Sequence, residues 1–84
     1  MTLDSLGAMP HVTGVKQVTK AVRRGNAVCV FLASDADFRV IRPLREECEA
    51  AGVEFSESAT MTEIGAAASI EVGASAAAVL RNPC

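Results

Sequence analysis

The sequence predicts an α/β protein, a three-layer α/β/α sandwich with a central mixed sheet of about four strands. Short apolar, β-branched runs, which are typical of strands, alternate along the chain with segments whose apolar residues recur at helical spacing. This alternation places helices on both faces of one sheet. Half of the residues are hydrophobic but only 4% are aromatic, so small side chains must bring the layers close together. Because 84 residues suffice for one modest core, we expect a single domain over 1–84.

The first part of the chain favours a helical turn, an edge strand and an amphipathic helix. Residues 3–8 (LDSLGA) suit a short helical turn, and residues 9–12 (MPHV) suit a strand that its proline confines to an edge or a first position. Between Val15 and Arg24 the apolar residues fall on one side of a helix and the cations on the other. Gly25 then supplies the stop.

A buried strand and a longer helix follow. Residues 27–33 (AVCVFLA) form a continuous apolar run, the pattern of a strand covered on both faces. SDAD, at 34–37, is then a turn. Since proline suits the first position of a helix, we expect a helix that begins near Pro43 and ends at Gly52. Its expected buried stripe is Leu44, Cys48 and Ala51.

The last third of the chain predicts strand, helix, loop and strand. Residues 53–55 (VEF) form a short strand, and residues 60–68 form a helix that opens on a T-x-x-E capping box. Residues 70–75 (IEVGAS) are a loop of small residues. Residues 76–80 (AAAVL) close the domain as a buried strand.

No cofactor, metal site or membrane segment is expected. Cys29, Cys48 and Cys84 are odd in number and widely spaced, which argues against a disulfide framework and a zinc site. We expect the first two to be buried and Cys84 to be an incidental terminal thiol. No apolar run approaches the roughly 20 residues of a membrane-spanning helix, and no signal-peptide pattern opens the chain. A cytoplasmic protein is the resulting expectation.

Enzymatic chemistry has weak support. Asp35 and Asp37 would be a carboxylate pair for a metal or for acid–base catalysis, but their place between a strand and a helix favours capping. No phosphate-binding loop, nucleophile elbow or dinucleotide fingerprint occurs. We therefore expect a protein that is not an enzyme.

The segment GVKQVTKAVRRG, residues 14–25, gathers four of the eight Lys and Arg of an acidic chain. A helix that begins after Gly14 presents free backbone N–H groups and the positive end of its dipole. Ammonium and amide donors there can reach phosphate oxygens and the N7 and O6 acceptors of guanine. Polyanion binding fits this pattern, and so does an ordinary solvated basic face. The donors along this helix are Lys16, Gln17, Lys20, Arg23 and Arg24.

Three motifs, GVKQVTKAVRRG, DAD and IGAAASIEVGASAAAVL, together resemble the L7Ae family of kink-turn RNA-binding ribosomal proteins. The resemblance is strongest to the small bacterial ribosomal-protein-like members and spans about residues 12–80. It implies the same sandwich fold and a structured RNA partner, either ribosomal RNA or a riboswitch-like RNA. A kink-turn is a sharply bent RNA duplex whose bend is flanked by tandem sheared G·A pairs.

The resemblance implies two RNA contacts. The start of the basic helix would sit in the widened groove beside the G·A pairs, and an apolar loop would cover an unstacked nucleotide. The small residues of that loop would let its backbone approach the kink. The implied RNA-binding residues are Gly14, Lys16, Gln17, Lys20, Arg23, Arg24, Ile70, Glu71, Val72, Gly73 and Ala74.

The sequence departs from the family pattern beside this loop. Relatives often carry Lys where Thr62, Glu63 and Ala66 stand, and commonly have Gly where Ser69 stands. Weak phosphate attraction is expected there. The alternative function is a protein-interaction module of the same fold with weakened or lost RNA affinity. Nine of the ten acidic residues lie in 34–84, which indicates that the domain has an acidic face. A ribosomal or other protein partner would bind that face.

Overall fold

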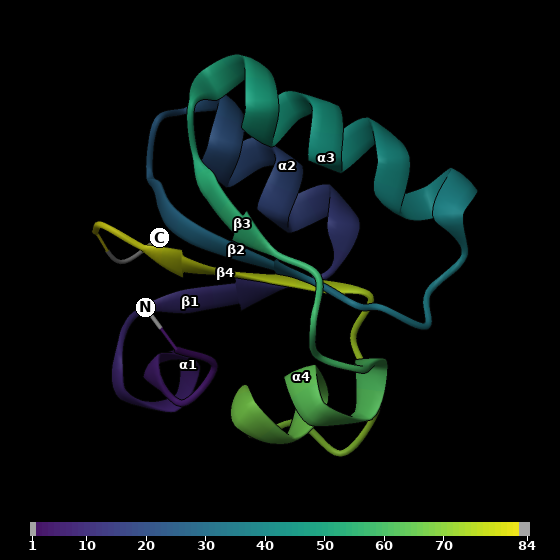
Figure 1. The fold of residues 1–84 in the computed structure, drawn as a ribbon. Helices are drawn as coiled ribbons and strands as arrows, with labels where there is room; N and C mark the ends of the chain where they lie inside the picture. Colours follow the sequence, from purple (N-terminus) through teal and green to yellow (C-terminus); the bar gives the residue numbers. More distant parts are fainter. Residues whose placement is uncertain (1, 83–84) are drawn as a thin grey trace.

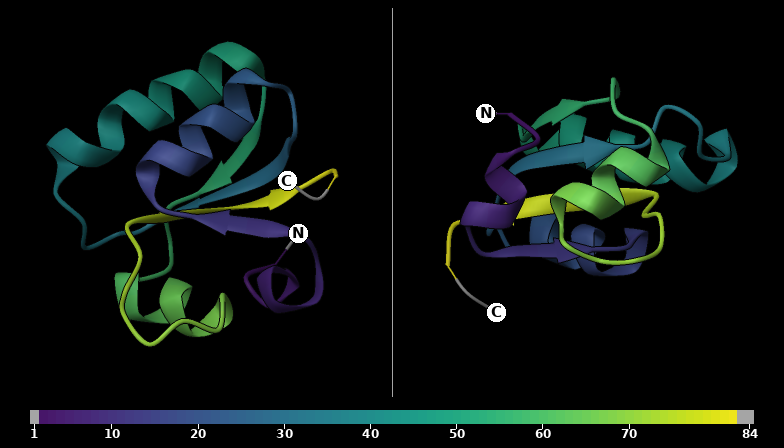
Figure 2. Two further views of the ribbon diagram at one scale, coloured as in Figure 1. Left: turned by 180° about the vertical axis from the view of Figure 1, so that it is seen from behind. Right: turned by 90° about the horizontal axis from the view of Figure 1, so that it is seen from below.

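A computed structural model describes residues 2–82, which form a four-stranded sheet with helices on both faces (Figure 1). Helices α2 and α3 cover one face, and α1 and α4 cover the other, as the two views of Figure 2 also show. The three-layer α/β/α sandwich is therefore confirmed. The elements in chain order are α1 (Ser5–Ala8), β1 (His11–Thr13), α2 (Val15–Arg23), β2 (Ala27–Leu32), α3 (Phe38–Ala51), β3 (Glu54–Ser56), α4 (Met61–Ala67) and β4 (Ala76–Leu80).

The sheet is mixed and its strands are not in chain order. The order is β1-β4-β2-β3, with β4 antiparallel to both β1 and β2, and β3 parallel to β2. Every residue of β4 is buried, and its side chains alternate between the two faces of the sheet. Three of them are alanines, which lets the helices on both sides approach the central strands closely.

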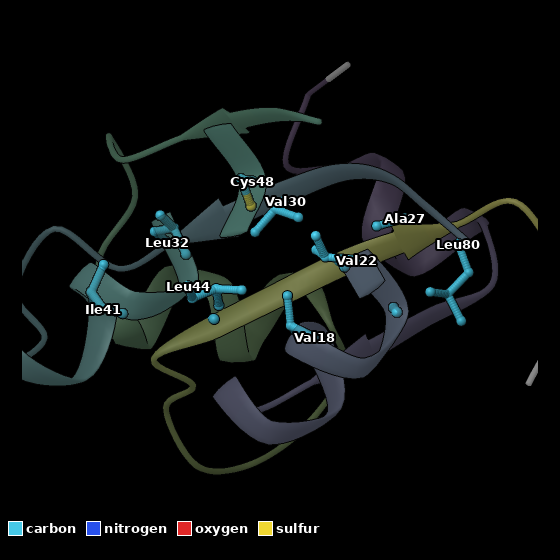
Figure 3. Packing of buried hydrophobic residues seen from close by; sticks show 12 residues of the cluster. Val18, Val22, Ala27, Val30, Leu32, Ile41, Leu44, Cys48 and Leu80 are labelled. Carbon is cyan, nitrogen blue, oxygen red and sulfur yellow. The ribbon is translucent and has the colours of Figure 1, made fainter. Parts of the chain in front are cut away.

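Two hydrophobic clusters, one on each face, hold the layers together. The cluster beneath α2 and α3 is drawn in Figure 3, where Val18 and Val22 of α2 face Leu44 and Cys48 of α3 across Val30 of β2. The other cluster joins the sheet to α1 and α4. Its largest buried members are Leu6, Phe31, Ile64 and Val79.

The buried thiols are as predicted. Cys29 lies in the cluster beside α1 and α4, and Cys48 lies in the cluster beneath α2 and α3. Burial raises the pKa of the Cys29 thiol and raises that of Cys48 to about 11. Cys84 lies outside the described residues.

Helix α3 begins at Phe38 and not near Pro43, so the predicted start was wrong. The Asp37 side chain caps the helix by accepting a hydrogen bond from the backbone N–H of Arg39 at 2.9 Å. An interior proline costs about 3 kcal/mol. The cap contributes about 1 kcal/mol and burial of Ile41 about 1.5–3 kcal/mol, so together these gains balance that cost.

The buried stripe of α3 also differs from the prediction. Ile41, Leu44 and Cys48 are buried, whereas Ala51 is exposed. The earlier start adds a turn whose Ile41 belongs to the stripe, and the stripe ends before the last turn. No helix within residues 2–82 is long and apolar enough to cross a membrane.

The capping box of α4 is confirmed. The Thr60 hydroxyl accepts a hydrogen bond from the backbone N–H of Glu63 at 3.2 Å, and the Glu63 carboxylate accepts one from the backbone N–H of Thr60 at 2.9 Å. Two N–H groups at the helix start are thereby satisfied. The cap fixes where α4 begins and hence where the loop after it starts.

Candidate functional site

One backbone hydrogen bond brings the two candidate contacts, the start of α2 and the loop after α4, to the same edge of the sheet. The N–H of Gly14, the residue before α2, donates to the carbonyl of Ala76, the first residue of β4, at 2.9 Å. The loop of residues 70–75 therefore enters the sheet beside the start of α2 (Figure 1). Gly14 has φ +90°, a conformation that favours glycine.

The first half of α2 presents donors to solvent. No side chain caps the helix at Gly14, so its first N–H groups and the positive end of its dipole are available to a ligand. Lys16, Gln17 and Lys20 are all exposed. Neither lysine forms a salt bridge with another residue of the 2–82 range. These side chains are thus available for an external anion.

Arg23 and Arg24 lie at the other end of α2. Arg23 donates to one carboxylate oxygen of Glu47 in α3 from both Nη2, at 2.8 Å, and Nε, at 3.1 Å. This hydrogen bond with Glu47 raises the pKa of Arg23. At a helical rise of about 1.5 Å per residue, Arg23 is about 10 Å along the axis from Lys16. The structure therefore does not bring this pair of arginines together with the loop.

The loop is folded back against α4. A Schellman turn ends the helix, in which the N–H groups of Ser69 and Ile70 donate to the carbonyls of Ala66 and Gly65. A Cβ atom on Gly65 would lie only 2.3 Å from the carbonyl oxygen of Val72. Only glycine at position 65 allows the loop backbone to pass this close to the helix.

The loop exposes an apolar tip, which we call the lip and define as residues 70–73. Val72 is 71% exposed and Ile70 is 37% exposed, and Glu71 and Gly73 are also at the surface. Ala74 is different because it is buried in the cluster beside α1 and α4. Its side chain supports the loop and is not presented to a ligand.

The two aspartates after β2 serve as caps. Asp35 accepts a hydrogen bond from the backbone N–H of Met61 at the start of α4, at 2.8 Å. Asp37 caps α3 and pairs with Arg39 at 3.1 Å, and hydrogen bonds from Arg39 lower the pKa of Asp37. No group of metal-binding side chains occurs among residues 2–82. The structural interpretation of both carboxylates is confirmed.

The first turn of α3 is a surface that the sequence interpretation missed. Phe38 is 59% exposed and Val40 is 44% exposed. The segment before them is joined to the loop, because the N–H of Ala33 donates to the carbonyl of Ser75 at 2.8 Å. The sequence signal for this turn is Asp37, because an aspartate at this position favours a helix that starts at the next residue.

Comparison with known proteins identifies the family. The sequence profile of the ribosomal protein L7Ae/L30e/S12e/Gadd45 family matches residues 9–84. The chain belongs to this family.

Two relatives match this chain in sequence, and a solved structure matches it in fold. The chain is 39% identical over 68 residues to the RNA-binding protein TTE2299 of Caldanaerobacter subterraneus subsp. tengcongensis, covering 81% of this chain and 83% of the relative. It is 41% identical over 68 residues to the large ribosomal subunit protein eL8 of Halobacterium salinarum, covering 80% and 57%. The structure of the Giardia lamblia 15.5kD RNA binding protein superposes with a TM-score of 0.86 at 24% identity, covering 95% and 68%, which shows the shared fold.

The surface of α4 beside the lip carries no lysine or arginine. Thr62, Glu63 and Ala66, where we expected weak phosphate attraction, are all exposed on α4. Glu63 is also held in the capping box. The surface of α4 therefore adds no positive charge at these positions, and the cations nearest the site come from other elements.

Proposed function

We propose that this protein binds structured RNA that contains a kink-turn, such as ribosomal RNA or a riboswitch-like RNA, in the cytoplasm and without catalysing a reaction. The observation that carries the proposal is the Gly14–Ala76 hydrogen bond, which holds the start of α2 beside the loop that forms the lip. RNA-binding and ribosomal proteins are among the relatives. Their names support RNA as the ligand class.

The start of α2 and the lip offer different chemistry to an RNA. Lys16, Gln17 and Lys20 offer donors that suit phosphates and the guanine edges of sheared G·A pairs. Ile70 and Val72 offer an exposed apolar surface that suits a base displaced from its stack. The protein would thereby recognise the bent shape of the RNA and two of its base pairs.

The charges at the edge limit how strongly salt affects binding. Arg23 and Arg24 lie at the far end of α2, so Lys16 and Lys20 are the cations of α2 that remain for the end beside the lip. Two phosphates neutralised by these lysines contribute about −2 to the slope of log affinity against log salt. A contribution of this size indicates modest electrostatic affinity.

A gel-shift titration tests the proposal. One RNA carries a kink-turn, and a matched RNA has its G·A pairs replaced by Watson–Crick pairs. Wild-type protein is expected to prefer the kink-turn, and Lys20→Glu is expected to remove most of the affinity. Arg81→Glu is the matched control, because it makes the same charge change at an exposed residue just after the far end of β4.

Two outcomes would count against the proposal. Equal affinity for the two RNAs contradicts kink-turn specificity, and no affinity for either favours the alternative protein-interaction module. The neutral and acidic surface of α4 beside the lip supports that alternative. A partner held through the acidic second half of α3 would still bind the Lys20→Glu variant.

A further inference from the structure

Phe38 is the one phenylalanine that the described part of the protein presents to solvent. Its side chain is 59% exposed, whereas Phe31 is 4% exposed and Phe55 packs against the cluster beneath α2 and α3. Arg45 also lies over the Phe55 ring, 5.8 Å from its centroid. Phe38 is the first residue of α3 and has no such covering.

Phe38 lies at the edge that carries the candidate site. Helices α2 and α3 pack side by side on one face of the sheet. Their N-terminal ends lie at the end of the molecule where the loop after α4 enters the sheet from the other face, as Figure 1 and the back view of Figure 2 show. The β2–α3 connection that leads to Phe38 is held beside the loop by the Ala33–Ser75 hydrogen bond and by Asp35, which binds the backbone of Met61.

The charge of α3 favours a polyanion at this end. Its first half carries Arg39 and Arg42 and no acidic residue, whereas its second half carries Arg45 together with Glu46, Glu47 and Glu49. Arg39 and Arg42 pair with Asp37 and Glu46, but these pairs are exposed. Exposed ion pairs contribute little, so both arginines can turn toward phosphates. An exposed aromatic ring beside cations is the combination with which proteins stack unpaired bases and hold their phosphates.

We propose that the ring of Phe38 stacks on an unpaired base of the bound RNA, as a third contact in addition to α2 and the lip. This inference rests on the proposed function. Stacking needs an open ring face and tolerates any base, so Phe38 would add affinity without reading sequence. The expected loss when the ring is removed is about tenfold in affinity.

Four variants at two positions test the stacking. Affinity is measured for a kink-turn RNA that carries the fluorescent base 2-aminopurine at each unpaired kink position in turn. Phe38→Trp should bind as wild type does, whereas Phe38→Leu and Phe38→Ala should each lose about tenfold in affinity. Val40→Ala is the matched control, because it removes an exposed apolar side chain from the same turn and should change affinity less than twofold. Fluorescence quenching at one position should occur with Phe or Trp and be absent with Leu.

The outcomes separate this inference from the proposed function. Wild-type affinity in Phe38→Leu and Phe38→Ala, with kink-turn preference intact, overturns the stacking alone and leaves the turn as a surface for a protein. Loss of affinity in Phe38→Ala without any kink-turn preference supports the stacking and contradicts the proposed specificity. No RNA binding by wild type overturns both. Thermal unfolding of each variant excludes misfolding, which is not expected at an exposed side chain.

Discussion

Ser69 adopts a backbone conformation that ordinary side chains avoid. Its φ is +62°, the one positive φ at a non-glycine residue in the range 2–82. The residue follows the C-cap of α4 in the Schellman turn, where glycine is strongly preferred. The left-handed conformation costs an L-residue about 1–2 kcal/mol. The loop that bears the lip is thus built on a strained turn.

Replacing Ser69 with Gly should stabilise the protein. The relief of strain exceeds the extra conformational entropy that glycine gives the unfolded chain, which is about 0.5–1 kcal/mol. We expect Ser69→Gly to raise the free energy of unfolding by about 0.5–1 kcal/mol in urea titrations. Ser34→Gly, at an exposed residue with an ordinary φ, is the control and should lower it or leave it unchanged. A loss of stability in Ser69→Gly would contradict the interpretation that the backbone at Ser69 is strained.

At the scale of elements, α4 and the loop after it act as one unit. The loop leaves the helix at Ser69 and returns along it, so that the N–H of Ala74 donates to the carbonyl of Met61 at 3.1 Å. Gly65 lies between these two ends, where the Val72 carbonyl passes over the helix. The position of the lip therefore depends on the absence of a side chain at 65.

Gly65→Ala should displace the lip. The added Cβ would lie 2.3 Å from the Val72 carbonyl oxygen, so the loop backbone must move. Alanine favours the helix by about 1 kcal/mol and overpacking costs about 1–3 kcal/mol, so stability should fall by no more than about 2 kcal/mol. Affinity for kink-turn RNA is expected to fall about tenfold, the effect of losing one base contact.

The control for Gly65→Ala is Gly52→Ala, which destabilises the protein at a position away from the lip. Gly52→Ala places alanine at φ +69°, where its Cβ meets no atom within 4 Å and the lip is not involved. It should destabilise the fold and leave RNA affinity unchanged. If both variants lower affinity equally, the loss comes from stability and the positioning role of Gly65 is contradicted.

The elements differ in how well sequence could predict them, and α3 and α4 show why. The start of α4 follows from a local pattern, Thr60 with Glu63, and the structure has that capping box. The start of α3 offered two local signals, Asp37 and Pro43, and burial of Ile41 beneath the sheet decided between them. A tertiary contact of this kind cannot be read from a local pattern.

At the scale of the whole molecule, the candidate site exists because the strand order is not the chain order. β1 pairs with β4, so that Thr13 lies opposite Ala77. This pairing brings the start of α2 close to the loop that bears the lip. Periodicity predicted the elements and the layers but not this pairing. The meeting of α2 and the lip was therefore expected from the family resemblance alone. Phe38 was missed for a related reason, because its exposure depends on how α3 packs.

The buried thiols make the stability of the whole molecule sensitive to alkaline pH. The pKa of Cys48 is raised from 9.0 to about 11 by burial, and that of Cys29 is also raised. Below pH 9 the thiols are protonated in both states, and this contribution to stability is fully present. As pH rises above 9 the unfolded chain loses its thiol protons first, so the free energy of unfolding falls until the folded thiols also ionise.

Cys48 alone should account for a loss of about 2–3 kcal/mol between pH 9 and 11, because each unit of pKa difference corresponds to about 1.4 kcal/mol. Urea titrations from pH 7 to 11 in a reducing buffer measure this loss. Cys48→Ala is less stable at pH 7 because it leaves a cavity, but its stability should fall less steeply above pH 9. The two proteins share every other side chain, so the difference between their curves reports mainly the Cys48 thiol. Parallel curves for wild type and Cys48→Ala would show that the Cys48 thiol ionises equally well in the folded protein, which its burial between α3 and the sheet does not allow.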